Sequence, residues 1–508
     1  MTLKTMIKTF ALFVAMALFV WQAPRPARAD NLPIAVACGA DRIGTSQHLR
    51  QAIFIANDTP GPDALVMDRC DYQLDGTHRT DPFFGRVSLP TIAEDLIIVG
   101  NNSRLYRSPD DQAYRMLVIG EGVKVTIRNL TFENGESGAS SLFGGSGQGG
   151  AIVMKGGANL TLKNVNFLGN TAAKRGGAIF GNSVTLTIRG GRFENNQARE
   201  ISGGAIYAFG QINIQGATFV GNQAGSSGGA LQLNNALTLD ENEFRGNRAG
   251  NETNVGQGGA IAVNFAGDSP NLRRNKFFEN EAGEGGAFHF VIGPPHSKNN
   301  QGVFIMLNNL WVRNRASQAG SHIYWRYTRS PEKPSNETDR TFVIHHNTFV
   351  GDPAVTASGL MVYFEGVTPD LGQFRNNIFA NHQLALENTG PKQVLLRSNL
   401  FQNNTTDRTG DYIARGNQLP GPNAPLFVDA ENDDFRLAAG SAAIDNGEDG
   451  LTLGTDIDGN PRPVGRSYDM GAYEFSQITG PPIPDEPPSP DDPQPEGEFF
   501  IFLPLLVK

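Results

Sequence analysis

The stretch Phe167–Phe180, FLGNTAAKRGGAIF, contains two markers that return along the chain. A Gly-Gly-Ala or closely related element recurs every 25 to 30 residues, starting at Gly149, Gly176, Gly203, Gly228, Gly258 and Gly285. A Phe-x-x-Asn element keeps step with it, at Phe167/Asn170, Phe193/Asn196, Phe219/Asn222, Phe244/Asn247 and Phe277/Asn280, with weaker copies at Trp311/Asn314 and Phe401/Asn404. Two markers with one period indicate a supersecondary unit stacked on copies of itself.

A short alternating segment precedes each phenylalanine, as in LTLKNVNF from Leu160. Alternation is the pattern of a half-buried strand, so Leu160 and Leu162 should face inward while Thr161 and Lys163 face outward. A second strand should begin at each Gly-Gly-Ala-Ile, and the repeat shows no helical pattern, so turns join the strands. These features predict an all-β fold, a right-handed parallel β-helix.

The repeated residues have structural roles in this prediction. The phenylalanines should stack in the interior. Each asparagine should lie at a turn, where it tolerates left-handed geometry and can bond neighbouring backbone. The paired glycines should occupy conformations or close coil contacts that a Cβ would forbid.

The remaining sequence divides the 508-residue chain into further parts. Lys4 and Lys8, an apolar run from Phe10 to Val20 and Ala27-Arg28-Ala29 have the pattern of an export signal, so we expect an exported, extracellular or cell-surface protein. The predicted parts are a signal peptide (1–29), an N-terminal cap with first strands (30–95), the β-helix repeats (96–405), C-terminal coils (406–475), a spacer rich in Pro and acids (476–497) and an apolar tail (498–508).

Cysteine content and net charge bear on disulfide formation and on the class of binding partner. Export permits a disulfide between the only two cysteines, Cys38 and Cys70, and two free thiols are the alternative. The net charge of −9, with no basic block, argues against nucleic acid as a partner.

The combined Gly-Gly-Ala-Ile and Phe-x-x-Asn repeats resemble those of chlamydial polymorphic outer membrane proteins and related bacterial right-handed β-helix proteins. The segment Gln47–Met67, QHLRQAIFIANDTPGPDALVM, is similar to the one that opens many such proteins. Its pattern predicts a short capping helix with Leu49, Ile53 and Ala56 on one face, followed by a turn and a strand. Such a helix would close the end of the solenoid.

The C-terminal part carries a second resemblance. PLFVD from Pro425, FRLAAGSAAIDNG from Phe435, TDIDGNPRP from Thr455 and YDMGAYEF from Tyr468 together resemble the bacterial choice-of-anchor Q segment, which implies attachment to the cell envelope. The apolar tail FFIFLPLLVK is too short to span a bilayer. It is similar to short Leu-Pro-Leu tails of bacterial surface proteins and would serve as a sorting or attachment signal, or else fold back as a strand.

Neither resemblance implies a fixed catalytic set. Among the acidic residues, Asp240, Glu241 and Glu243 are the densest group near the repeat, and a solvated face paired with Arg273 and Arg274 is the favoured interpretation. Asp456, Asp458 and Asn460 place oxygen donors at alternate positions and are a candidate Ca²⁺ site, although Gly459 does not fit an EF-hand and a simple turn is the alternative.

Other candidates are weaker. His345 and His346 are adjacent in a predicted strand and should point to opposite faces, so they would not share one ion. His289 and His322 fall in preceding coils. If the chain has an active site, irregular segments such as Gly293–Gly302 or Arg329–Arg340 would overhang it.

We therefore predict an exported, surface-attached β-helix that binds an extracellular polysaccharide or a host or cell-surface component, with no required cofactor. A polysaccharide lyase or hydrolase is the alternative, and a passive envelope spacer is a third possibility.

Overall fold

The computed structural model describes residues 33–39, 41–59, 61–76, 78–81, 83–138, 146–234, 237–264, 270–292, 303–327, 341–364, 372–450 and 452–476. The predicted signal peptide, the apolar tail, the spacer beyond Ser476 and the segments Gly293–Gly302 and Arg329–Arg340 lie outside the described residues. Within the described ranges, no helix has the length and apolar character needed to cross a membrane.

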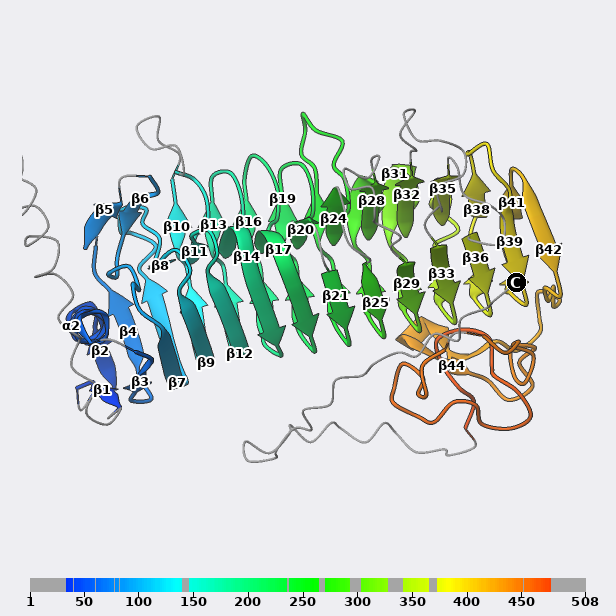
Figure 1. Ribbon diagram of the computed structural model, residues 1–508. Coiled ribbons are helices and arrows are strands. Elements are labelled where there is room, and N and C mark those ends of the chain that lie inside the picture. The colour runs from blue at the N-terminus through cyan, green and yellow to red at the C-terminus, as the bar shows by residue number, and fades with distance from the viewer. Residues whose placement is uncertain are drawn as a thin grey trace, which may run out of the picture. The chain divides into compact units, whose positions relative to one another are not determined.

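The repeats form the predicted parallel β-helix (Figure 1). In the part of the chain that the structure describes, 33 strands join in one sheet, and each coil pairs in parallel with the next. The register follows the sequence repeat, because Phe167 pairs with Phe193 and Phe193 with Phe219.

Each coil has three faces, and the central coils add a short turn row. Face A contains β7 (Leu96–Arg107), β9 (Lys124–Glu133), β12 (Asn159–Leu168), β14 (Ile179–Arg189), β17 (Ile206–Gln215), β21 (Leu237–Asp240), β25 (Asn271–Arg273), β29 (Val303–Leu307), β33 (Thr341–His345), β36 (Gly372–Arg375), β39 (Val394–Arg397) and β42 (Tyr412–Arg415). Face B contains β8 (Leu117–Ile119), β11 (Ile152–Met154), the first residues of β14 and β17, β20 (Leu231–Asn234), β24 (Ile261–Asn264), β28 (Phe288–Ile292), β32 (Ile323–Tyr327), β35 (Leu360–Phe364), β38 (Leu384–Asn388) and β41 (Thr406–Thr409).

Face C contains the last residues of β7, β9 and β12, then β15 (Arg192–Glu194), β18 (Thr218–Val220), β22 (Glu243–Arg245), β26 (Lys276–Phe278), β30 (Leu310–Val312), β34 (Thr348–Val350), β37 (Ile378–Ala380) and β40 (Leu400–Gln402). The turn row contains β10 (Glu136–Ser137), β13 (Thr171–Ala172), β16 (Gln197–Ala198), β19 (Gln223–Ala224), β23 (Arg248–Ala249), β27 (Glu281–Glu284) and β31 (Arg315–Ala319).

The interior is the predicted aromatic stack. Phe193 is fully buried, and its ring stacks on Phe167 at 4.9 Å and on Phe219 at 4.7 Å between centroids. The stack continues to Trp311. Leu160 and Leu162 face inward while Lys163 is exposed, as the alternation predicts.

The asparagines of the repeat from Asn170 to Asn314 are fully buried and form a ladder along the solenoid. Asn222 Oδ1 accepts hydrogen bonds from the backbone N and side-chain Nδ2 of Asn196, and Asn222 Nδ2 donates to Asn247 Oδ1. The predicted bonding is therefore confirmed, but the predicted left-handed geometry belongs to the preceding residue, as in Asn195 at φ 54° and Gly221 at φ 63°. That residue turns the chain so that the asparagine amide can point inward.

The two glycines of each pair have different structural roles, one a left-handed conformation and the other a close contact between coils, and both roles were predicted. Gly176 is left-handed, with φ +62°. Gly204 lies so close to the next coil that a Cβ would stand 1.9 Å from the Gly229 carbonyl oxygen. Only glycine fits both positions.

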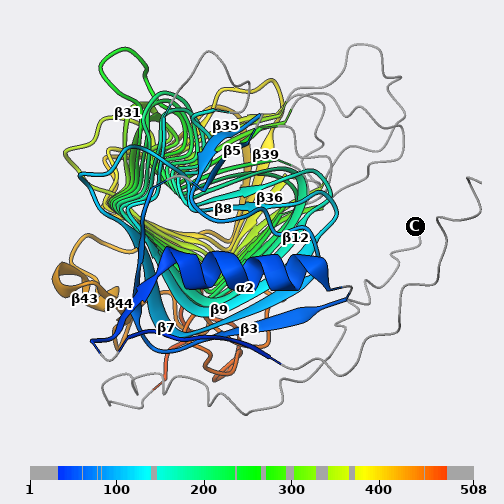
Figure 2. The same ribbon diagram turned by 90° about the vertical axis from the view of Figure 1, so that its left-hand side faces the viewer.

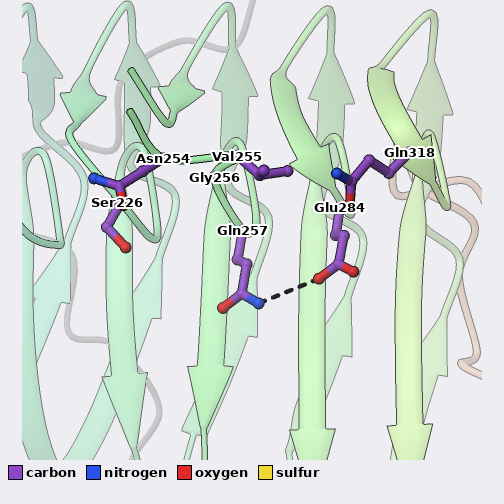
Figure 3. Close-up of a pocket in the computed structure, with 7 residues that line it drawn as sticks. All are labelled: Ser226, Asn254, Val255, Gly256, Gln257, Glu284 and Gln318. Carbon is purple, nitrogen blue, oxygen red and sulfur yellow. Dashed lines mark hydrogen bonds between the residues drawn. The ribbon is translucent and has the colours of Figure 1, made fainter. Parts of the chain in front are cut away.

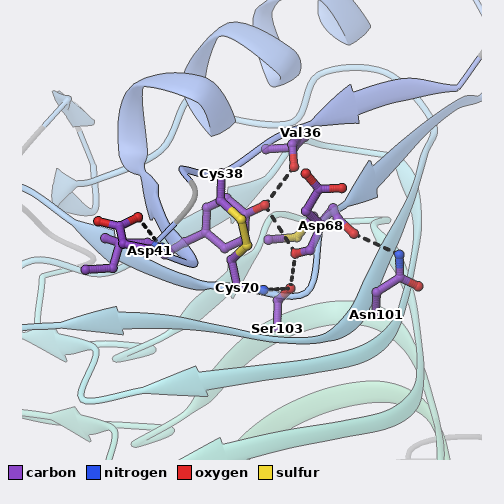
Figure 4. The surroundings of a disulfide bond; sticks show 10 residues. Val36, Cys38, Asp41, Asp68, Cys70, Asn101 and Ser103 are labelled. Atoms are coloured by element: carbon purple, nitrogen blue, oxygen red, sulfur yellow. Dashed lines mark hydrogen bonds between the residues drawn. A yellow bond between two sulfur atoms is a disulfide. The ribbon is translucent and has the colours of Figure 1, made fainter.

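The N-terminal cap contains the predicted helix. α2 (Ser46–Asp58) buries Leu49, Ala52, Ile53 and Ala56 and lies across the first coils (Figure 2). The first strands are β1 (Ile34–Val36), β2 (Ile43–Thr45), β3 (Asp63–Met67), β4 (Asp71–Leu74), β5 (Arg79–Asp81) and β6 (Gly85–Val87). Cys38 and Cys70 are joined in a disulfide with Cα atoms 6.5 Å apart, and Cys70 N donates to Ser103 Oγ beside it (Figure 4).

The C-terminal part leaves the parallel pattern. β43 (Phe427–Asp429) and β44 (Asp434–Leu437) pair antiparallel, with the 3-10 helix η1 (Ala430–Asn432) between them. Phe435 and Tyr473 pack on face C. An ion pair connects this segment to the coils, because Arg313 Nη2 lies 2.5 Å from the Asp433 carboxylate.

Candidate functional site

Two adjoining hollows lie on the outer surface where face B meets the turn row. One, of about 390 Å³, is lined by Ser226, Asn254, Val255, Gly256, Gln257, Glu284 and Gln318 (Figure 3). The other, of about 420 Å³, is lined by Gln257, Glu284, His289, Val291, Tyr324 and Arg326. Because they share Gln257 and Glu284, we treat them as one depression, the site groove.

The repeat itself brings the groove residues together. Gln257 and Glu284 each precede a Gly-Gly pair and bridge in parallel. Farther along the coil, His289 of β28 pairs with Tyr324 of β32. Between them Gly285, with φ +62°, turns the chain, so Glu284 and His289 come from opposite sides of one tight corner.

A short loop, residues 250–256, forms one wall of the groove. Asn251 Oδ1 accepts hydrogen bonds from the backbone N of Thr253 and Asn254, which holds the loop in a compact turn. Val255 extends from this loop and is 54% exposed. Gly283 makes room for it, since a Cβ there would lie 2.0 Å from Val255 Cγ1.

Glu284 is the charged centre of the groove. Gln257 Nε2 donates to Glu284 Oε2 at 3.2 Å, and His289 Nε2 lies 3.5 Å from the same oxygen. The pKa of Glu284 is lowered, chiefly by the His289 side chain and against the effect of burial. The carboxylate is therefore ionised near neutral pH.

His289 is the unusual residue of the groove, because it is only 2% exposed and yet lines the hollow. Its ring stacks on Tyr324 at 4.9 Å between centroids. At 3.5 Å the contact with Glu284 is at the limit of a hydrogen bond, and neither ring nitrogen has an ordinary hydrogen-bond partner among the described residues. Nε2 thus has only this long contact, and Nδ1 has no partner among the described residues, which is costly for a buried imidazole and indicates that a ligand or solvent completes its bonding.

Tyr324 and Arg326 form the other rim. Burial, and then the Glu284 charge, raises the pKa of Tyr324, so its hydroxyl stays protonated and can donate. Arg326 is exposed and lies over the Tyr363 ring, with Cζ 5.1 Å from the centroid. The rim thus offers a phenol, a guanidinium and two aromatic faces.

A second aromatic group lies on the same face, nearer the N-terminus. Phe180 and Tyr207 stack at 5.4 Å between centroids, and Tyr207 contacts Phe209 at 4.9 Å. Arg175 Cζ lies 5.3 Å from the Tyr207 centroid. Strand register places Tyr207 and Tyr324 in one outward column, in the order Tyr207, Gln232, Ala262, His289, Tyr324.

The residues of the candidate Ca²⁺ site lie elsewhere, in the C-terminal segment. Asp456 is fully buried and accepts backbone hydrogen bonds from Asp458, Asn460 and Glu474, as in a turn. Asp458 pairs with Lys276 at 3.2 Å. In the described ranges, no cluster of three or more His, Cys, Asp or Glu residues could hold a metal. Calcium at this place stays a prediction.

The remaining sequence candidates are also accounted for. Asp240 and Glu241 both pair with Arg274, at 2.8 and 3.0 Å, which is the favoured ion-paired interpretation. His346 is fully buried, and its Nδ1 contacts the Asp469 carbonyl oxygen at 3.2 Å. His322 Nε2 lies 3.1 Å from His382 Nε2 in the interior. Of the histidines named from the sequence, only His289 lines the groove.

Sequence reasoning named His289 but not its neighbours. Aligning the repeats on the Gly-Gly pair would have found Tyr324, since the position three residues after the second glycine reads Val153, Phe180, Tyr207, Gln232, Ala262 and His289, and Tyr324 holds the same position after Gly320-Ser321. Of the two segments suggested as overhangs, both outside the described residues, Gly293–Gly302 follows β28 directly in the sequence and Arg329–Arg340 begins two residues after β32.

The Chlamydia polymorphic membrane protein repeat matches residues 164–182 of this chain. No curated protein matches this chain. Among solved structures, the Streptococcus pneumoniae surface protein and adhesin PfbA is similar at 13% identity and a TM-score of 0.39, covering 77% of this chain and 98% of that one. The Azotobacter vinelandii mannuronan C-5 epimerase AlgE6 A-module is similar at 12% identity and a TM-score of 0.36, covering 74% of this chain and 95% of that one. The choice-of-anchor Q resemblance stays a prediction.

Proposed function

We propose that this protein is an exported β-helix, attached to the cell surface by its C-terminal tail, that binds an extracellular polysaccharide in the site groove. One observation carries the proposal: His289 is buried, lacks an ordinary hydrogen-bond partner among the described residues, and lines a hollow rimmed by Tyr324 and Arg326. A few polar groups that converge in a surface hollow are the usual mark of a ligand site.

The composition of the groove favours a saccharide. Hydroxyl groups both donate and accept, and Gln257, Glu284 and Gln318 offer amide and carboxylate partners for them. Aromatic faces such as Tyr324 and Tyr207 suit the apolar faces of sugar rings. Coils follow one another at about 4.8 Å, which is close to the length of one hexose, so a glycan along the axis would meet an equivalent position in each coil.

The test incubates the mature chain, Asp30 to Lys508, with acidic and neutral polysaccharides in the presence and absence of Ca²⁺. It measures which polymers the protein retains. Tyr324→Ala should abolish retention of the neutral polymers, because it removes the aromatic rim and the phenol. The matched control is Tyr106→Ala, since Tyr106 is also half-buried, with Arg104 Cζ 4.5 Å from its ring centroid, but lies on β7. Equal losses in both variants, or none, would remove the groove as the binding site.

Catalysis is a second candidate, favoured by the contact of Glu284 with His289 and by the neighbouring phenol of Tyr324. A glycoside hydrolase of the usual kind needs two carboxyl groups, and Glu284 is the single carboxylate lining the groove among the described residues. A lyase, which needs proton transfer rather than a carboxylate pair, is therefore the better enzymatic alternative. Chain shortening and new ultraviolet absorbance of the polymer would reveal it, and retention without either would support binding alone.

Attachment is tested separately. Deleting residues 498–508 should release the protein from cells into the medium if the tail is an attachment signal. Retention of the truncated protein on cells would show that the tail is dispensable. If neither retention of polysaccharide nor cleavage occurs, the envelope spacer is the better account.

A further inference from the structure

A row of cations lies on face A, on a different surface from the site groove. Strand pairing places Arg128, Lys163 and Arg189 directly beside one another in three successive coils. All three side chains are exposed. We call these residues the cation row.

The charges in this row are uncompensated within the described ranges. No ion pair joins Arg128, Lys163 or Arg189 to a described carboxylate, whereas Arg104, Arg192, Arg245, Arg274 and Arg313 all have one. Like charges directly opposite on paired strands repel and destabilise a sheet. A chain with net charge −9 does not lack acidic residues that could neutralise such a row.

Hydroxyl groups accompany the row. Two residues before each cation stand Thr126, Thr161 and Thr187, which are paired in register and half-buried. The row is short, because Val99 precedes Arg128 in the column, and Gln215 and Asp240 follow Arg189. Asp240 is paired with Arg274, so it does not neutralise the row.

We propose that the cation row is a second binding surface, for a linear anionic polysaccharide that carries a carboxylate on each sugar. Three cations at about 4.8 Å intervals present one positive charge per coil, and a polyuronate presents one carboxylate per sugar at a similar spacing. The threonine hydroxyls alongside can bond the sugar hydroxyls. The proposal does not rest on the site groove.

The test measures the affinity of the full mature chain for an oligomer of polygalacturonate, which has a carboxylate on every sugar. Comparison ligands are a hyaluronan oligomer of equal length, with a carboxylate on alternate sugars, and a carboxyl-reduced neutral polymer. We expect the polyuronate to bind best, and binding to weaken as salt screens the exposed charges. Equal binding of the neutral polymer by the Tyr324→Ala variant, in which the site groove is disabled, would overturn the proposal.

The decisive variant is Arg128→Gln, Lys163→Gln, Arg189→Gln. Each exposed pair contributes little, so affinity should fall about threefold to fivefold per cation, or about 27-fold to 125-fold in the triple variant. The control is Arg248→Gln, an exposed arginine of the turn row paired with Glu281. A triple variant with unchanged affinity would overturn the proposal.

Two further measurements distinguish ligand binding from a structural role of the row, and polysaccharide from nucleic acid. The unfolding midpoint of the triple variant should equal or exceed that of the parent, since repulsion is removed, and a lower midpoint would mean that the row is structural. A DNA oligonucleotide that binds as tightly as the polyuronate would overturn the assignment to polysaccharide. In a Tyr324→Ala background, where the site groove is disabled, the polyuronate should still bind and the three Gln substitutions should still weaken it; loss of all polyuronate binding in Tyr324→Ala alone would assign that binding to the groove and overturn the proposal.

Discussion

Replacing Asn222 with Ala tests whether the asparagine ladder holds the coils together. The Asn222 side chain makes four hydrogen bonds: it accepts from the backbone N and from Nδ2 of Asn196, both at 3.0 Å, and donates to the Phe193 carbonyl oxygen and to Asn247 Oδ1, both at 2.9 Å. Truncation removes the printed bonds of the Asn196 backbone N and the Phe193 carbonyl oxygen, at about 1–3 kcal/mol each, whereas Asn247 Oδ1 still accepts from the Asn222 backbone N and Asn196 Nδ2 still donates to the Phe167 carbonyl oxygen. The free energy of unfolding should therefore fall by about 2–6 kcal/mol.

Equilibrium unfolding in urea measures this loss, and the buried Trp311 and Trp325 provide the fluorescence signal. Asn222→Leu should lose a similar amount, because it refills the volume but restores no hydrogen bond. Asn213→Ala is the control in the same coil: Asn213 is exposed, and its loss should change stability by less than about 0.5 kcal/mol. A loss below about 2 kcal/mol in both Asn222 variants would refute the reasoning.

Three other predictions concern the core, pH and the disulfide. Phe193→Ala should lower the free energy of unfolding by about 3–5 kcal/mol in the same urea assay, because it opens a cavity and breaks two ring contacts. Burial lowers the pKa of His382 to about 4, so the unfolded chain binds a proton between about pH 4 and 6.5 that the folded chain does not. The free energy of unfolding should therefore fall as the pH drops through that window, by about 3 kcal/mol more in the parent than in His382→Gln. Urea unfolding of both proteins at several pH values measures this difference, and equal pH profiles would contradict the prediction. Reducing the Cys38–Cys70 bond should increase hydrogen exchange in α2 while leaving the central coils protected, since coils interact mainly with their neighbours; uniform loss of protection would argue against this local coupling.

The solenoid was predictable because its residues repeat the same physical task in each coil. Phe, Asn and Gly recur where the interior needs an aromatic ring, a polar ladder and a turn without a Cβ. The facing of Leu160 and Lys163 followed from alternation alone. The left-handed residue was misplaced by one position, because Asn is favoured both in left-handed turns and as a buried hydrogen-bonding amide, and sequence does not distinguish these uses.

The groove could not be predicted in the same way, because it depends on residues that break the repeat. Glu284 and Tyr324 are far apart in sequence and meet only because strand pairing puts adjacent coils in register. The antiparallel β43–β44 pair was also missed, since apolar segments such as those around Phe427 and Phe435 indicate strands but not their direction. The repeat alone aligns Lys163 and Arg189 at one outward position, and strand register adds Arg128 to make a row of three cations.

The division between interior and outer surface explains how one repeat can support several binding surfaces. Backbone pairing and the buried Phe and Asn ladders stabilise each coil without using outward side chains. Outward positions are therefore free to vary, and a column of such positions presents a new side chain at each coil spacing. On face B the column contains aromatic and polar residues around His289, while on face A it contains cations beside threonines. Because a polymer with a similar repeat length can contact several coils at once, individually weak contacts add along the axis. This geometry suits an extended ligand better than a compact one, and it predicts that affinity for either surface rises with oligomer length until the column is filled.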